Sequence, residues 1–65
     1  MQGTVKFFHA ERGFGFITPD KGEDVFVHVS NLHPAANATL NDGQTVEFEI
    51  GQGRRGDEAR NVRPI

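Results

Sequence analysis

The sequence predicts an all-β protein, a small antiparallel barrel of five strands. Three observations lead to this prediction: five short segments are rich in β-forming residues, turn residues separate them, and no segment has a convincing helical period. The chain has 65 residues, which allows one domain with a small core. It contains no cysteine, so packing alone must hold the barrel together.

Composition and charge narrow the protein class. Hydrophobic residues make up only 35% of the chain, but they fall in ordered clusters, which is typical of a folded domain. No apolar run reaches membrane-spanning length, and the N-terminus lacks the features of a signal peptide, so we expect a cytoplasmic protein with no membrane partner. The net charge of -2 disfavours a polyanion partner. Phosphate binding depends, however, on the local field within about 8 to 10 Å.

The first strand is expected within residues 1–8, where the segment from Thr4 to Phe8 is rich in β-forming side chains. The doublet of Phe7 and Phe8 interrupts the alternation. It indicates a bulge, a strand end or burial on both sides of the strand, and the sequence leaves these three options open.

A turn at residues 9–13 leads into the second strand, Arg12–Ile17, which should end at Thr18–Pro19 because proline cannot donate to a ladder. The period of two places Phe14 and Phe16 on one face, and the glycines with Ile17 on the other. Paired glycines indicate tight curvature or a surface that a partner approaches closely. Two phenyl rings beside a cation suit base stacking and phosphate contact.

After a polar hairpin turn at residues 20–23, residues 24–29 show the cleanest alternation in the chain and predict the third strand. The face expected in the core carries Val25, Val27 and Val29. The other face carries Phe26 and His28. Antiparallel pairing with the second strand would gather the aromatic side chains of both strands on one outer face.

Residues 30–43 show no strand period; one helical turn with a buried Leu32 is expected at its start, followed by a surface loop. Residues 44–50 alternate and predict a half-buried fourth strand, whose buried side chains would be Val46, Phe48 and Ile50. Residues 51–56 form a flexible basic loop. A weak fifth strand at residues 58–62 has Ala59 and Val62 as apolar points. Five short strands with one aromatic outer face favour an OB-type barrel.

Two of these segments resemble the ribonucleoprotein motifs of the bacterial cold-shock domain: Arg12–Ile17 is similar to the first and Val25–His28 to the second. Single positions match along essentially the whole chain: Gly3, Val5, Lys6, Asp24, Gly43, Gln44, Asn61 and Val62. The resemblance implies one cold-shock domain over residues 1–65, with a five-stranded antiparallel OB-fold. It further implies a nucleic-acid chaperone that binds single-stranded RNA and DNA.

The resemblance also implies the binding residues. Aromatic stacking is expected at Phe7, Phe14, Phe16, Phe26 and His28. Lys6, Arg12 and Arg55 would lie near the backbone of the bound strand, while Phe8 would be partly structural. Sequence specificity should be low, because every base offers a π-face for stacking.

The chain departs from the family pattern at several positions. Phe7 stands where members usually carry tryptophan, His9 where asparagine is usual, and Asp57 where proline follows the basic loop. Val29 and Asn37 occupy positions where many members present further phenylalanines. Because each stacked base contributes roughly 1 to 3 kcal/mol, we expect weak to moderate binding and a shortened footprint.

The same residues allow other interpretations. In an arbitrary sequence, six phenylalanines would more often form the core; here the alternation assigns valines and Ile17 to the interior. A small barrel that uses its aromatic patch to bind proteins is the alternative function, whereas a nucleic-acid-binding protein is expected to be a monomer. An enzyme is not expected, because no nucleophile–base pair or carboxylate dyad is evident. The spacing of the three histidines fits no ligand motif, so neither a metal nor another cofactor is expected.

Overall fold

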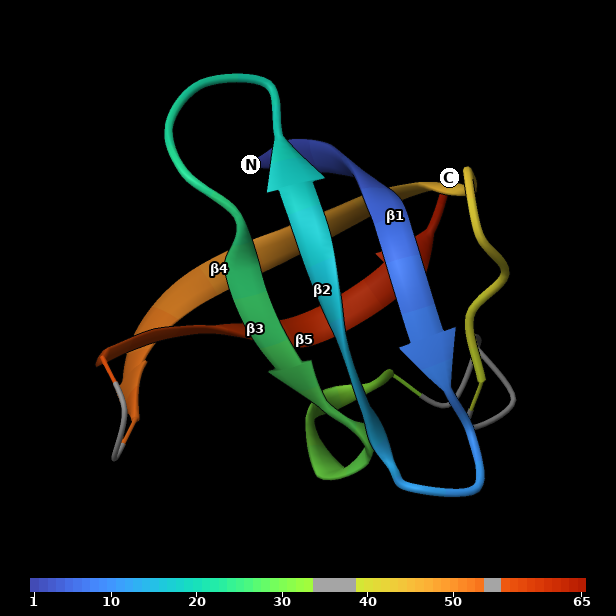
Figure 1. Cartoon of the computed structure of the whole chain (residues 1–65). Helices are drawn as coiled ribbons and strands as arrows, with labels where there is room; N and C mark the ends of the chain where they lie inside the picture. The colour runs from blue at the N-terminus through green and yellow to red at the C-terminus, as the bar shows by residue number, and fades with distance from the viewer. Residues whose placement is uncertain (34–38, 54–55) are drawn as a thin grey trace.

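The computed structural model describes residues 1–33, 39–53 and 56–65, which form a closed five-stranded barrel (Figure 1). The elements in chain order are β1 (Gln2–His9), β2 (Phe14–Pro19), β3 (Val25–His28), the 3-10 helix η1 (Val29–Asn31), β4 (Thr45–Gly53) and β5 (Gly56–Pro64). The predicted all-β barrel of five strands is confirmed. The last strand is longer than the sequence indicated and spans 9 residues.

One seam of the barrel differs from the prediction. The strands close in the order β1-β2-β3-β5-β4, and every pairing is antiparallel except that between β3 and β5, which is parallel. An odd number of strands cannot alternate in direction all the way around a closed ring, so one parallel pair is unavoidable. The predicted five-stranded antiparallel barrel is therefore confirmed, with this parallel pair as its one exception among the described strands.

A β-bulge in β1 explains the phenylalanine doublet. Val5 pairs with Ile17 and Phe7 pairs with Phe16, so Lys6 is an extra residue with no partner of its own. The extra residue reverses the alternation. Phe7 consequently joins the outer face of the barrel, while Phe8 is 9% exposed and belongs to the core.

Close contact between β1 and β2 explains a glycine of the second strand. A Cβ atom added at Gly15 would lie 2.2 Å from the carbonyl oxygen of Phe7 and 2.7 Å from the Cα atom of Phe8. Any side chain at this position would collide with the backbone of β1. Of the two explanations that the sequence left open, close approach applies, and the approaching backbone is that of the neighbouring strand.

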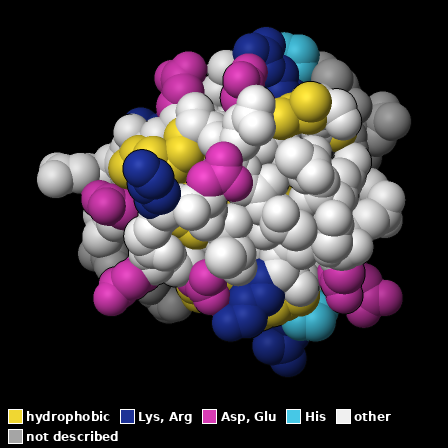
Figure 2. Space-filling view, turned by 90° about the horizontal axis from the view of Figure 1, so that it is seen from above, with side chains coloured by type: hydrophobic (Ala, Val, Ile, Leu, Met, Phe, Trp, Pro, Cys, Tyr) yellow, Lys and Arg dark blue, Asp and Glu magenta, His cyan; other side chains and the backbone are white. Residues whose placement is uncertain are grey.

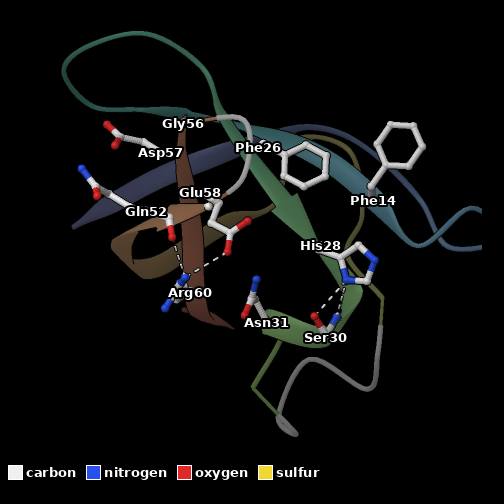
Figure 3. A pocket seen from close by; sticks show the side chains of 11 residues that line it. Phe14, Phe26, His28, Ser30, Asn31, Gln52, Gly56, Asp57, Glu58 and Arg60 are labelled. Carbon is white, nitrogen blue, oxygen red and sulfur yellow. Dashed lines mark hydrogen bonds and ion pairs between the residues drawn. The ribbon is translucent and has the colours of Figure 1, made fainter.

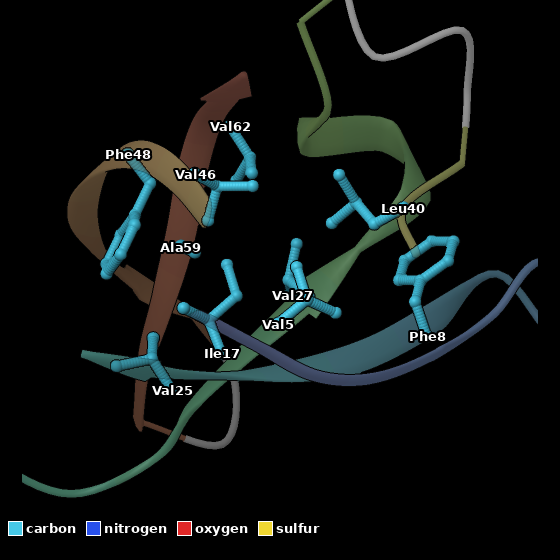
Figure 4. Packing of buried hydrophobic residues seen from close by; sticks show 10 residues of the cluster. All are labelled: Val5, Phe8, Ile17, Val25, Val27, Leu40, Val46, Phe48, Ala59 and Val62. Carbon is cyan, nitrogen blue, oxygen red and sulfur yellow. The ribbon is translucent and has the colours of Figure 1, made fainter. Parts of the chain in front are cut away.

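The core is aliphatic apart from two phenylalanines, and every strand contributes to it (Figure 4). Its buried members are Val5, Phe8, Ile17, Val25, Val27, Leu40, Val46, Phe48, Ala59 and Val62. Val29 and Leu32 are only partly buried and pack against this cluster. Both had been expected inside, but η1 begins at Val29 and carries these two residues to the margin of the barrel.

Ile50 is exposed, contrary to the prediction from the alternation in β4. Its exposed fraction is 41%. The reason lies in the strand pairing, because β1 covers β4 only from Thr45 to Glu47. Beyond this point β4 continues with β5 as a hairpin that projects from the barrel (Figure 1). Ile50 lies on this projecting part.

Candidate nucleic-acid interface

Five rings form a closed circuit on the outer face of β1, β2 and β3, and we call this set the aromatic platform. Its members are Phe7, His9, Phe14, Phe16 and Phe26. Starting from Phe7, successive ring centroids are 5.6 Å apart to Phe16, 5.8 Å to Phe26, 6.1 Å to Phe14, 6.0 Å to His9 and 5.0 Å back to Phe7. These separations are typical of aromatic pairs in contact. The four phenyl rings are half-buried and belong to no part of the core.

Strand register brings these rings together. Phe16 lies opposite Phe26 across the β2–β3 pair and opposite Phe7 across the β1–β2 pair. The bulge at Lys6 is required for this arrangement, because without it Phe7 would face inward. His9 follows on the same face of β1 and pairs with Phe14. The sequence analysis did not propose His9 as a site residue, although its spacing of two from Phe7 was a usable signal.

His28 lies at the end of the platform, opposite Phe14. Its Nδ1 atom accepts a hydrogen bond from the backbone N–H of Ser30 at 3.1 Å and lies 2.9 Å from the Ser30 hydroxyl. His28 thereby acts as the N-cap of η1. Because Nδ1 accepts this bond, the proton of the neutral ring must be on Nε2. The ring is held in place and has a donor left for a ligand.

Lys6 lies beside the platform but is not free. Its Nζ atom is 2.9 Å from Oδ2 of Asp24, and the Thr18 hydroxyl donates to the other carboxylate oxygen at 3.0 Å. The hydrogen bond from Lys6, followed by that from Thr18, lowers the pKa of Asp24 below its ordinary value of 3.8. The side chain of Lys6 is 57% exposed, so the pair is open to solvent and easily exchanged for another partner.

Of the two other predicted cations, Arg12 and Arg55, only Arg12 is among the described residues. Arg12 is exposed in the turn between β1 and β2, and among the described residues its guanidinium makes no hydrogen bond or ion pair. Its backbone N–H donates to the carbonyl of His9 at 3.1 Å, which places Arg12 next to the platform. Arg55 lies outside the described residues.

A groove of about 750 Å³ runs between the platform and the β4–β5 hairpin (Figure 3). Phe14, Phe26 and His28 form its aromatic wall, while Ser30 and Asn31 reach it from η1. The opposite wall is polar and comes from the hairpin: Gln52, Glu58 and Arg60. The volume is within the range of pockets that hold small ligands. Sequence analysis missed the polar residues, because no local pattern shows that this hairpin faces the aromatic strands.

A second, smaller pocket of about 520 Å³ adjoins Phe16 and Phe26. Three carboxylates line it: Glu23, Asp24 and Asp57. The acidic groups therefore lie closer to the platform than their positions in the sequence indicated. The face seen in Figure 2 likewise carries acidic and basic side chains side by side, with apolar atoms in small separate patches. A bound polyanion would have to keep to the side of the platform that carries Arg12.

The described residues offer neither a metal site nor a membrane-spanning helix. Within residues 1–33, 39–53 and 56–65, no group of three or more His, Asp or Glu side chains is placed to hold a metal ion. The described part of the chain also has no helix that is long and apolar enough to span a membrane.

Comparisons with known proteins agree with the fold. Residues 1–65 match the 'Cold-shock' DNA-binding domain family. The chain is 52% identical to the probable cold shock protein A of Mycolicibacterium smegmatis, covering 98% of this chain and 97% of that protein. It is 52% identical to the cold shock protein CspC of Bacillus subtilis, covering 94% and 92%. For the cold shock-like protein of Thermotoga maritima the identity is 48%, covering 100% and 98%.

A solved structure is similar in fold. The Drosophila Unr structure CSD456 superposes with a TM-score of 0.78 at 20% sequence identity, and the match covers 98% of this chain and 26% of the Unr chain. An identity this low is evidence for the fold alone. The match over all 65 residues and the identity of about one half to full-length relatives are evidence for the family. The chain, with its OB-type barrel and aromatic outer face, therefore belongs to the cold-shock domain family.

Proposed function

We propose that this protein binds single-stranded RNA and DNA by stacking bases on the aromatic platform, and that it acts as a nucleic-acid chaperone. The observation that carries the proposal is the closed circuit of five rings on the outside of the barrel, contacting one another but not the core. Single-stranded bases stack on such rings without regard to sequence, at about 1 to 3 kcal/mol per base. The whole chain, residues 1–65, would act as one binding domain.

The charges around the platform support a direction for the bound strand. Arg12 offers a free guanidinium beside β1, whereas Glu23 and Asp57 lie at the opposite margin. Arg12 attracts phosphates, whereas the two acidic side chains repel them. The backbone of the nucleic acid would therefore follow the β1 side, and its bases would point across the platform toward β3. Lys6 would contribute once a phosphate replaces Asp24 as its partner.

Weak binding with a short footprint fits a chaperone. The platform has four phenyl rings and His9, with His28 at its end, which is room for only a few bases. With few phosphate contacts and incomplete stacking, the bound nucleic acid dissociates quickly. A chaperone needs this fast release, because it must let go of a strand after melting its transient base pairs. A monomer in the cytoplasm remains the prediction from the sequence, and the proposal involves binding without catalysis.

The test is a titration of labelled heptamers of deoxythymidine and of uridine at two salt concentrations. The label must be on the oligonucleotide, because the chain contains neither Trp nor Tyr. We expect saturable binding of both, with a log-log salt slope of roughly -0.7 for each phosphate contact. A duplex of the same length should bind more weakly, because its bases are already stacked.

The alternative function, a protein adaptor that uses the platform as its interface, makes the opposite prediction. Such an adaptor would show no binding of either heptamer that salt reverses. The half-buried rings would then be an apolar patch for a protein partner.

A further inference from the structure

The groove beside the platform contains a side-chain amide with no partner. Asn31 is half-buried, lines the groove, and among the described residues its amide makes no hydrogen bond. Figure 3 shows it rising from η1 into the groove, between Arg60 and Ser30. The amide is open to solvent and has no partner within the described part of the protein, so a ligand in the groove can bond to it.

The position of Asn31 is set by His28, at the end of the platform. Asn31 is the last residue of η1, and this helix begins at the N-cap formed by His28. The Nδ1 atom of His28 accepts from the N–H of Ser30, one residue before Asn31. A ring on which a base can stack therefore also holds the turn that presents the amide.

Arg60 and Glu58 form the polar wall opposite Asn31 and pack closely against β4. Arg60 Nη2 donates to the carbonyl of Gln52 at 2.8 Å and to Oε1 of Glu58 at 3.2 Å. Both side chains lie flat on β4, because a Cβ at Gly51 would meet Arg60 at 2.3 Å and one at Gly53 would meet Glu58 at 2.4 Å. Among the described residues, the second carboxylate oxygen of Glu58 has no partner. It remains an acceptor on the edge of the groove.

We propose that Asn31 reads the edge of one base stacked in this groove, and that it selects a base whose amino group lies beside an unprotonated ring nitrogen, as in adenine and cytosine. This inference rests on the proposed single-strand binding. The amide matches such an edge with two hydrogen bonds, accepting from the amino group and donating to the ring nitrogen.

Glu58 distinguishes these bases from the others. An amino group has a second hydrogen, which the free oxygen of Glu58 accepts. Uracil and thymine present a carbonyl oxygen at the corresponding position, and a carboxylate repels it. Arg60 does not offset this repulsion through Nη2, because that nitrogen is already bonded to Gln52 and Glu58.

The experiment compares three labelled deoxythymidine heptamers whose central base is adenine, thymine or purine, the last being adenine without its amino group. Purine stacks like adenine, so the ratio of the two affinities isolates the amino group. We expect the adenine heptamer to bind about fivefold or more tightly than the purine heptamer, the factor that one bidentate contact supplies. A heptamer with a central cytosine should show the same advantage over thymine.

Asn31→Ala should reduce the adenine-to-purine ratio severalfold while binding of the purine heptamer is retained, and the ratio that remains is the contribution of Glu58. Asn41→Ala is the matched control, because Asn41 lines neither the groove nor the second pocket. If Asn31→Ala fails to fold in a thermal melt, Asn31→Leu keeps the size and should also reduce the ratio, since its side chain cannot accept from the amino group. A ratio of one in the wild-type protein, or an unchanged ratio in these variants, overturns the proposal. Absence of binding to every heptamer would instead overturn the proposed function.

Discussion

The two faces of the β2–β3 pair carry side chains of similar hydrophobicity, but only those on the inner face are fully buried. Ile17 and Val27 point inward and are fully buried, whereas Phe16 and Phe26, one position away along the same strands, point outward and stay half-buried. The outer rings are larger, so hydrophobicity alone does not decide which residues enter the core. The phase of the strand decides the direction of each side chain, and the closed barrel has room for aliphatic groups on its concave side.

The inner face should respond to truncation through stability. Ile17→Ala removes a side chain with no exposed surface from the centre of the core, and we expect it to lower the free energy of unfolding by about 2 to 5 kcal/mol. Small domains have little stability to lose, so this variant should be largely unfolded at room temperature. Urea unfolding followed by circular dichroism measures the change. A loss no larger than that of Phe16→Ala would remove the distinction between the faces.

The outer face should respond through binding. Phe16→Ala and Phe26→Ala should each weaken binding of the thymidine heptamer by about 1 to 3 kcal/mol, because each removes a ring on which a base stacks. The fold should survive, with a loss near 1 kcal/mol from broken ring pairs. Ile50→Ala is the matched control, since Ile50 is an exposed apolar residue outside the platform. Equal losses of affinity in all three variants would mean that the platform is not the binding surface.

The smallest effect is expected at the margin of the platform, from the pair of Lys6 and Asp24. The pKa of Asp24 is lowered in the folded protein, so the pair stabilises the fold above the ordinary carboxyl pKa of 3.8 and loses this contribution as the pH falls below it. Asp24→Asn should therefore reduce the pH dependence of the melting temperature in that acidic range. Glu47→Gln should do the same independently, because Arg63 lowers the pKa of Glu47.

Melting curves between pH 5 and about pH 3 test this prediction. An acid transition that is identical in both variants and in the wild-type protein would contradict it. The Asp24→Asn variant also releases Lys6, so its affinity for the thymidine heptamer should rise slightly at low salt.

Local alternation in the sequence was enough to predict the strands, the aliphatic interior and most of the platform. Phe14, Phe16 and Phe26 could be assigned to the outer face because valines and Ile17 occupy the alternate positions. The Phe7–Phe8 doublet could not be resolved, since the bulge that separates the two rings depends on pairing with β2. Ile50 was placed wrongly for a similar reason: the point at which β1 stops covering β4 depends on long-range pairing, and it comes before Ile50.

The groove lay beyond what the sequence can indicate. Its polar wall comes from the β4–β5 hairpin and its aromatic wall from β2 and β3, and these meet only because β3 and β5 run in parallel at the seam of the barrel. Nothing near Asn31 in the sequence distinguishes its amide from a solvated one. Long-range strand order, which single-sequence patterns do not contain, brings these side chains together.

Because Lys6 is an extra residue in β1, the fold depends on the presence of a residue at this position more than on the identity of its side chain. Lys6 itself is solvent-exposed, so many replacements should be accommodated there. Deleting the residue would instead turn Gly3 and Val5 outward or return Phe7 to the interior and expel Phe8. Deleting this one residue would thus disrupt the outer aromatic face and the core together, although none of their own side chains would have been substituted.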